Sequence, residues 1–241
     1  MKKLLYIITA ITFITLSCDK DNVESDTGTG GSMARFTIKD NYLYTVDYEN
    51  LHSFNISNPA DIVHENKQYL GFGIETIFPT EDYLFIGANN GMYIYSLEEP
   101  SSPVRKSFTA HFVARDPVVV QGNYAYATIR SNPDFTWAEA NQLLIFDISN
   151  VIVPELVIQY QMVNPRGLGI DGETLFVCDN VLKVYTVTNG YEIELKHTFD
   201  IQAIDVIPKN GRLYVLTENG IYQYDYDGEN ITLISSLTTN S

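Results

Sequence analysis

Tyr42-Leu43-Tyr44-Thr45-Val46-Asp47 is the first of five related segments that decide the fold. The others are Tyr83-Leu84-Phe85-Ile86-Gly87, Tyr124-Ala125-Tyr126-Ala127-Thr128, Thr174-Leu175-Phe176-Val177-Cys178-Asp179 and Arg212-Leu213-Tyr214-Val215-Leu216, at spacings of 41, 41, 50 and 38 residues. A turn pair precedes each segment: Asp40-Asn41, Glu81-Asp82, Gly122-Asn123, Gly172-Glu173 and Asn210-Gly211. Most of these residues tolerate a positive φ or bond their own backbone, as tight hairpins require. Each segment is therefore predicted to be a strand that follows a tight turn.

A second series of aromatic residues repeats with the same period. It contains Phe54, Tyr95, Phe146, Tyr185 and Tyr224, at spacings of 41, 51, 39 and 39 residues. Each unit also has a short apolar strand before the quoted segment and a more polar strand at its end, and no part of the body has helical spacing. A period near 40 residues with four strands per unit is typical of a β-propeller.

The sequence thus predicts an all-β, five-bladed β-propeller of four-stranded antiparallel blades that close a small ring. The expected blades are residues 33–70, 73–111, 113–162, 164–200 and 201–238 within a domain at 33–241. A two-sheet sandwich is the alternative, but it does not predict a fixed repeat.

Composition limits the classes of function. Residues 1–17 carry two lysines and no acid, and the rest of the chain carries 13 basic and 30 acidic residues, a net charge of −17. Binding to nucleic acid depends on clustered Lys and Arg, so this composition argues against a nucleic-acid partner. Two cysteines cannot make a disulfide framework.

The N-terminus indicates an export signal. Residues 1–17 have a charged start, a short apolar stretch and small residues before Cys18, and the stretch is too short for a permanent membrane span. Thr15-Leu16-Ser17-Cys18 resembles a lipobox, which implies that Cys18 is lipidated; an ordinary secretory signal is the alternative. Residues 18–32 are expected to be a flexible tether. Asp19-Lys20-Asp21-Asn22 is similar to the signal that sends such lipoproteins to the cell surface, or it is a solvated spacer. We expect an outer-membrane lipoprotein exposed on the cell surface.

Two short phrases carry a family resemblance. Leu43-Tyr44-Thr45-Val46-Asp47 and Leu175-Phe176-Val177-Cys178-Asp179 resemble the LVIVD motif. Asn55-Ile56-Ser57-Asn58-Pro59 and Asp147-Ile148-Ser149-Asn150 resemble the turn that follows it. Residues 33–238 are similar to LVIVD repeat-containing β-propeller lipoproteins of Bacteroidetes-type bacteria. The resemblance implies a fold and a location, and it implies no catalytic residues and no cofactor.

Alignment of the five units places charged residues near the start of each first strand, which lines the channel in propellers. These residues are Arg35, Glu75, Arg115, Asp116, Arg166 and Asp205. Arginine forks suit carboxylate or phosphate groups, so the set is a candidate ligand site. The alternative is a set of mutually compensating ion pairs. A glycan-active hydrolase or lyase that uses Glu75, Asp116 and Asp205 is a third possibility, but nearby arginines would depress the pKa of its acid.

The third unit is longer, and the extra residues form a loop with Phe135 and Trp137. Exposed aromatic residues in such a loop could contact a protein or glycan, or they could fold back onto the blade. The segment 225–230 has oxygen-bearing side chains that could hold Ca²⁺, but a hairpin turn is the preferred interpretation. We expect His52, His64, His111 and His197 to lie far apart in different blades, and Cys178 to be a buried thiol. The sequence therefore predicts a non-catalytic binding or scaffold module for a protein, envelope component or glycan, without metal or cofactor.

Overall fold

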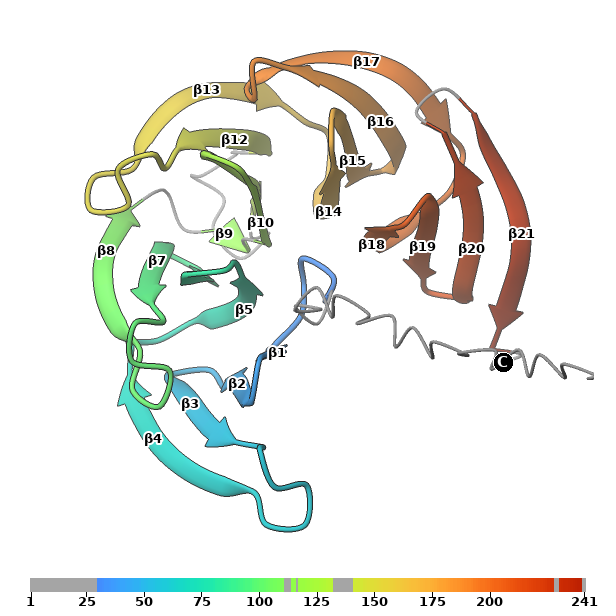
Figure 1. The fold of residues 1–241 in the computed structure, drawn as a ribbon. Helices are drawn as coiled ribbons and strands as arrows, with labels where there is room; N and C mark the ends of the chain where they lie inside the picture. The colour runs from blue at the N-terminus through green and yellow to red at the C-terminus, as the bar shows by residue number, and fades with distance from the viewer. Residues whose placement is uncertain (1–29, 111–113, 116, 132–140, 228–229, 240–241) are drawn as a thin grey trace, which may run out of the picture.

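The computed structural model describes residues 30–110, 114–115, 117–131, 141–227 and 230–239. This part of the chain is all-β, with five antiparallel sheets arranged about one axis (Figure 1). The structure confirms the predicted five blades of four strands. Among the described residues there is no helix that could span a lipid bilayer.

Each blade is a meander in which consecutive strands pair. Blade one contains β1 (Phe36–Lys39), β2 (Tyr42–Val46), β3 (Asn50–Asn55) and β4 (Val63–Tyr69); blade two contains β5 (Ile74–Pro79), β6 (Tyr83–Ala88), β7 (Gly91–Ser96) and β8 (Val104–Ala110). Blade three contains β10 (Val118–Gln121), β11 (Tyr124–Ser131), β12 (Gln142–Asp147) and β13 (Glu155–Gln161), and the two-residue β9 (Ala114–Arg115) pairs with β11. Blade four contains β14 (Pro165–Asp171), β15 (Thr174–Asp179), β16 (Val181–Thr188) and β17 (Glu192–Phe199); blade five contains β18 (Ala203–Lys209), β19 (Arg212–Thr217), β20 (Gly220–Tyr226) and β21 (Ile231–Thr238).

The predicted turn pairs form the first hairpin of each blade. Asp40, Gly122, Gly172 and Asn210 have φ angles between 53° and 58°, which a tight hairpin requires. In blade two the turn is wider, and the Thr80 amide donates to the carbonyl of Tyr83 at 2.8 Å. The second aromatic series marks a different feature. Each of its residues, Phe54, Tyr95, Phe146, Tyr185 and Tyr224, lies at a β-bulge between the third and fourth strands.

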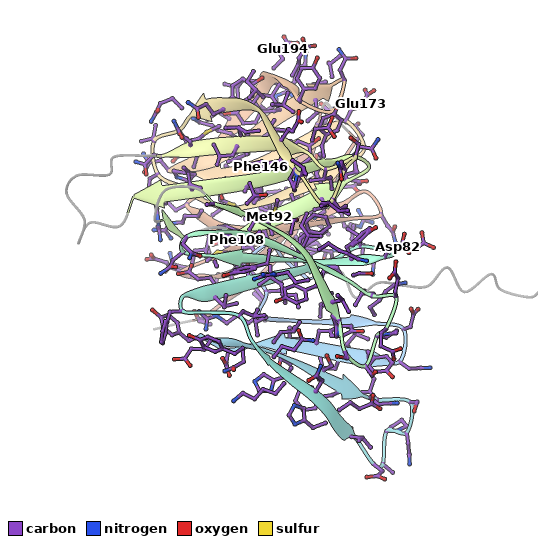
Figure 2. All side chains as sticks on the ribbon, turned by 90° about the vertical axis from the view of Figure 1, so that its left-hand side faces the viewer. Asp82, Met92, Phe108, Phe146, Glu173 and Glu194 are labelled. Atoms are coloured by element: carbon purple, nitrogen blue, oxygen red, sulfur yellow. The ribbon has the colours of Figure 1, made fainter. Side chains whose placement is uncertain are left out.

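The core consists of four apolar clusters, one at each boundary between consecutive blades. We call the face of a blade toward the next blade its front and the opposite face its back. The third residue of the second strand packs on the front: Tyr44, Phe85, Tyr126 and Phe176 are each at most 1 % exposed. In Figure 2, Met92 and Phe146 lie between blades two and three, whereas Asp82, Glu173 and Glu194 lie at the surface. Packing of aromatic residues between sheets thus holds neighbouring blades together.

The five blades form an open arc, because blade one and blade five are well separated in Figure 1. The first strands contact in chain order from β1 to β5, β10, β14 and β18. No apolar cluster of the described residues joins blade one to blade five. The expectation of a closed ring was therefore wrong: the sheets of blade one and blade five do not pack against each other.

The first described residues lie in the middle of this arc. Gly31 and Ser32 are buried, and the Ser32 hydroxyl accepts from the Leu168 amide at 2.9 Å. The Ala34 carbonyl accepts from the Ile77 amide at 2.9 Å. Residues 31–34, which we call the axial segment, thus connect blades two and four at the centre of the molecule.

Candidate functional site

A cavity of about 490 Å³ lies at the end of the axis where the first strands begin. All five blades contribute to it, through the starts of first strands, the end of the second strand β11 and the turn after β2. Its lining residues are Met33, Arg35, Tyr48, Glu75, Thr76, Pro117, Arg130, Pro165, Arg166 and Ile204. Small-molecule sites in proteins have volumes of roughly 300–1,000 Å³, so this cavity is large enough for a small ligand.

The cavity carries more positive than negative charge. Among its described lining residues there are three guanidinium groups, those of Arg35, Arg130 and Arg166, and one carboxylate, that of Glu75. Arg166 lies 3.9 Å from Glu218, whose side chain is 77 % exposed, so this ion pair is weak. Among the described residues, the Arg35 guanidinium has no ion pair or hydrogen bond. The described lining of the cavity is therefore basic, in a chain whose net charge is −15.

Asp205 lies beside the cavity but is buried. Its carboxylate accepts hydrogen bonds from the Ser32 hydroxyl at 2.7 Å, the Met33 amide at 3.1 Å and the Val206 amide at 3.0 Å. Burial raises the pKa of Asp205 to about 6, and these hydrogen bonds oppose the rise. Asp205 thus fixes the axial segment to blade five.

Two glycines make room for this carboxylate. A Cβ atom on Gly167 would lie 2.8 Å from the Cα atom of Asp205 and would overlap its Oδ1 atom. A Cβ atom on Gly31 would overlap Oδ2 and lie 2.9 Å from the carboxyl carbon. The absence of side chains at Gly31 and Gly167 therefore allows blades four and five to approach the axial segment.

The structure brings together part of the predicted charged set. Arg35, Glu75 and Arg166 line the cavity, and Asp205 lies under the axial segment. Arg115 is in β9, opposite Arg130 of β11 in the backbone register. Asp116, the loop residues Phe135 and Trp137, and Cys18 lie outside the described residues.

Sequence reasoning did not include Arg130 and Tyr48 in the site. The predicted set contains only residues near the starts of first strands, but second strands end at the same end of the axis. Arg130 comes directly after Ile129, near the end of β11. Its position at the end of a second strand was the sequence signal that could have placed it in the site.

The aspartates of the sequence motifs have structural roles. The Asp179 carboxylate accepts from the Val163 amide at 2.9 Å and from the Lys183 ammonium at 2.7 Å. The Asp147 carboxylate accepts from the Ser149 amide at 2.8 Å, which forms an Asx turn. The Asp227 carboxylate accepts from the Asn230 amide at 2.7 Å, as a hairpin turn would.

The expectation that the histidines lie in different blades was wrong for one pair. His52 Nδ1 and His64 Nε2 are 3.3 Å apart in blade one, and His52 Nε2 is 3.0 Å from Asp47 Oδ2. The cause is the antiparallel pairing of β3 with β4, in which a bulge shifts His64 opposite Phe54. Within the described ranges, no group of three or more His, Cys, Asp or Glu residues is arranged to hold a metal ion. Cys178 is a buried free thiol, as predicted, and burial raises its pKa.

Comparisons with known proteins agree with this fold. A family model described as the LVIVD repeat matches residues 135–162. This match includes the turn phrase Asp147–Asn150 but neither of the two strand phrases quoted above. No curated protein matches the chain.

Solved structures with the same fold are distant in sequence. A functionally unknown protein from Desulfotomaculum acetoxidans has a TM-score of 0.67 at 13 % identity, over 82 % of this chain and 66 % of its own. The periplasmic gluconolactonase PpgL of Pseudomonas aeruginosa has a TM-score of 0.63 at 12 % identity, over 83 % and 68 %. BamB from Moraxella catarrhalis has a TM-score of 0.53 at 12 % identity, over 84 % and 62 %. The chain spans about two thirds of the length of these proteins, and such identities show the fold alone. The chain is thus a five-bladed β-propeller that carries an LVIVD repeat.

Proposed function

We propose that this protein is a non-catalytic binding module of the cell envelope, and that its axial cavity binds a small ligand with a carboxylate or phosphate group. The observation that carries the proposal is the cavity of about 490 Å³, whose described lining includes three arginines and one glutamate. Guanidinium groups bind carboxylate and phosphate in a bidentate way, and charge-assisted hydrogen bonds are stronger than neutral ones. In a chain with 30 acidic residues, such a cavity is the region where an anion would be attracted.

The location in the envelope is part of the proposal. The apolar stretch before Cys18 and the polar segment after it support a lipid anchor on the outer membrane that faces the outside of the cell. Phe135 and Trp137 are candidates for contact with a partner protein, an envelope component or a glycan. The ligand of the cavity could then be an acidic group on that partner.

Binding can be measured by calorimetric titration of the full chain in detergent at about 150 mM salt. The probes are glucuronate, glucose as its neutral counterpart, and inorganic phosphate. We expect heat from glucuronate or phosphate and none from glucose. Arg35→Gln and Arg166→Gln should each lower the affinity for the anion about tenfold or more. A hydrogen bond to a charged group contributes roughly 1.5–3 kcal/mol.

The control is Arg105→Gln, an exposed arginine in β8 outside the cavity, which should leave the affinity unchanged. Equal weakening by all three variants would show that only the general charge of the protein matters. Equal heats from glucose and glucuronate would also contradict the proposal.

A glycan-active hydrolase is the second candidate. A carboxyl with a pKa raised to about 6, as at Asp205, is what a general acid requires. However, Asp205 is buried beneath Ser32 and Met33 and does not line the cavity, so only Glu75 among the described predicted carboxylates faces it. Chemical conversion of a bound glycan would favour this candidate over simple binding.

A further inference from the structure

The four boundaries between consecutive blades repeat one set of contacts. In blades one to four, the third residue of the second strand lies on the front of its blade and is covered by the next blade. Where this residue is tyrosine, its hydroxyl reaches a turn of the next blade. Tyr44 Oη donates to the Pro100 carbonyl at 2.8 Å, and Tyr126 Oη donates to the Gly190 carbonyl at 2.7 Å. A front face in this molecule is thus built to pack against a back face.

Blade five has a front face that no following blade covers. Tyr214, the third residue of β19, is 37 % exposed, whereas its four counterparts are at most 1 % exposed. Leu216, Ile221 and Leu237 form a row across β19, β20 and β21 in the strand register. They are 43 %, 47 % and 73 % exposed. This front face is open and carries one apolar row, beside a row formed by Tyr214, Gln223 and Ser235.

Blade one has a back face that no preceding blade covers. Ile38, Leu43 and Phe54 form a row across β1, β2 and β3, and Phe36 lies beside it opposite Thr45. Phe36 is 64 % exposed and Ile38 is 41 % exposed, whereas Leu84 and Leu175, the counterparts of Leu43 in blades two and four, are fully buried. The two uncovered faces are therefore the two halves of the contact that the molecule forms four times.

We propose that a second copy of this chain covers these faces, with blade five of one copy packed against blade one of the next. Continuity with the four internal boundaries favours this occupant, because a front face meets a back face at each of them. The repeat equates Pro59 with Pro100, which places an exposed turn carbonyl in blade one where the Tyr214 hydroxyl needs an acceptor. On the blade-five face Arg212 forms an ion pair with Asp225.

This contact is heterologous, because the two faces that meet are different. A heterologous contact produces either a ring or an open series of copies. It also means that damage to one face leaves the other face of the same molecule able to bind. That asymmetry allows a direct test.

Sedimentation velocity of the full chain in detergent, at about 1–100 µM and 150 mM salt, gives the first readout. We expect dimers and larger species that increase with concentration. Leu216→Asp on blade five and Phe36→Asp on blade one should each raise the concentration of half-assembly roughly tenfold or more. Leu195→Asp, a matched change at a 50 % exposed position of β17, should assemble like the wild type.

The decisive measurement mixes the two variants. Leu216→Asp retains an intact blade-one face and Phe36→Asp retains an intact blade-five face, so an equimolar mixture should form 1:1 dimers and nothing larger. A wild type that stays monomeric at all concentrations overturns the proposal. A mixture that stays monomeric also overturns it, as does a Phe36→Asp variant that dimerises alone, because that indicates a symmetric contact of blade five with itself. Circular dichroism of both variants separates loss of assembly from loss of folding.

Discussion

Asp205 is the residue at which blade four, blade five and the axial segment meet. Its carboxylate lies between Gly31 and Gly167, and neither position has room for a methyl group. We expect Gly167→Ala to destabilise the protein by about 1–3 kcal/mol, the usual cost of an added methyl group in a packed interior. The change should appear as a lower midpoint of urea unfolding with the slope unchanged. Gly172→Asn, at a turn position with open space around it, serves as the control. It should lower the free energy of unfolding much less than Gly167→Ala does. Equal midpoints for the two variants would contradict this account of Gly167.

The raised pKa of Asp205 predicts a pH dependence of stability. The folded-state pKa is about 6 and the ordinary value is 3.8, so the folded protein binds the proton more tightly than the unfolded chain. The stabilising contribution is complete below about pH 4 and is lost as the pH rises through about 6. Over this window it amounts to at most about 3 kcal/mol, since one pKa unit corresponds to roughly 1.4 kcal/mol.

Asp205→Asn removes this titration. The free energy of unfolding of the wild type, relative to that of the variant, should therefore fall from pH 4 to pH 7. The comparison uses the change with pH and not the absolute stability, because an amide cannot accept all three hydrogen bonds of the carboxylate. If the free energy of unfolding changed with pH in the same way for the wild type and the variant, Asp205 would have an ordinary pKa.

At the scale of single strands, the third residue of each second strand sets the contact between blades. Tyr126 Oη donates to the Gly190 carbonyl of blade four, whereas Tyr214 Oη has no acceptor among the described residues. Tyr126→Phe should therefore cost about 1 kcal/mol, the typical net value of a buried hydrogen bond. Tyr214→Phe should cost little when measured by urea unfolding of dilute, monomeric protein. Similar losses in both variants would mean that the Tyr214 hydroxyl already has a partner within one chain.

The strands themselves were predictable because their sequence signals are local. Gly122 and Asn210 mark turns through backbone conformation, and the aromatic series recurs with the period of the blades. The bulges at that series were not predicted, since the extra residue lies in the fourth strand of each blade, whose mostly exposed side chains show little alternation of polarity. The proximity of His52 and His64 was missed for the same reason, because one of these bulges determines which residues of β3 and β4 are neighbours.

The candidate site was only partly predictable. The location of Arg35, Glu75 and Arg166 in the cavity was predictable from their positions in the repeat, because first strands surround the axis. Arg130 depends on where a second strand ends, and the burial of Asp205 depends on a segment that lies more than 170 residues away in the sequence. Long-range contacts of this kind leave no periodic signal.

At the scale of the whole molecule, the number of blades was predictable but their closure was not. The angle between two blades depends on the volumes of the side chains packed between them, and small differences add up around the axis. Tyr44, Phe85, Tyr126 and Phe176 all occupy their boundaries, yet the five blades leave the arc open. Five copies of a repeat therefore specify five blades. The side chains packed at the boundaries determine the angles between the blades, and hence whether the ring closes.

The position of the axial segment also determines how the protein bears mechanical load. Ser32 is bonded to Leu168 and Asp205, and Ala34 is bonded to Ile77, so three blades hold this short stretch. We therefore expect a pull on the chain that precedes it to load these blades together before it peels β1 from β2. Tension from the N-terminal side is therefore resisted at the axis, where several bonds must break together before any blade unravels.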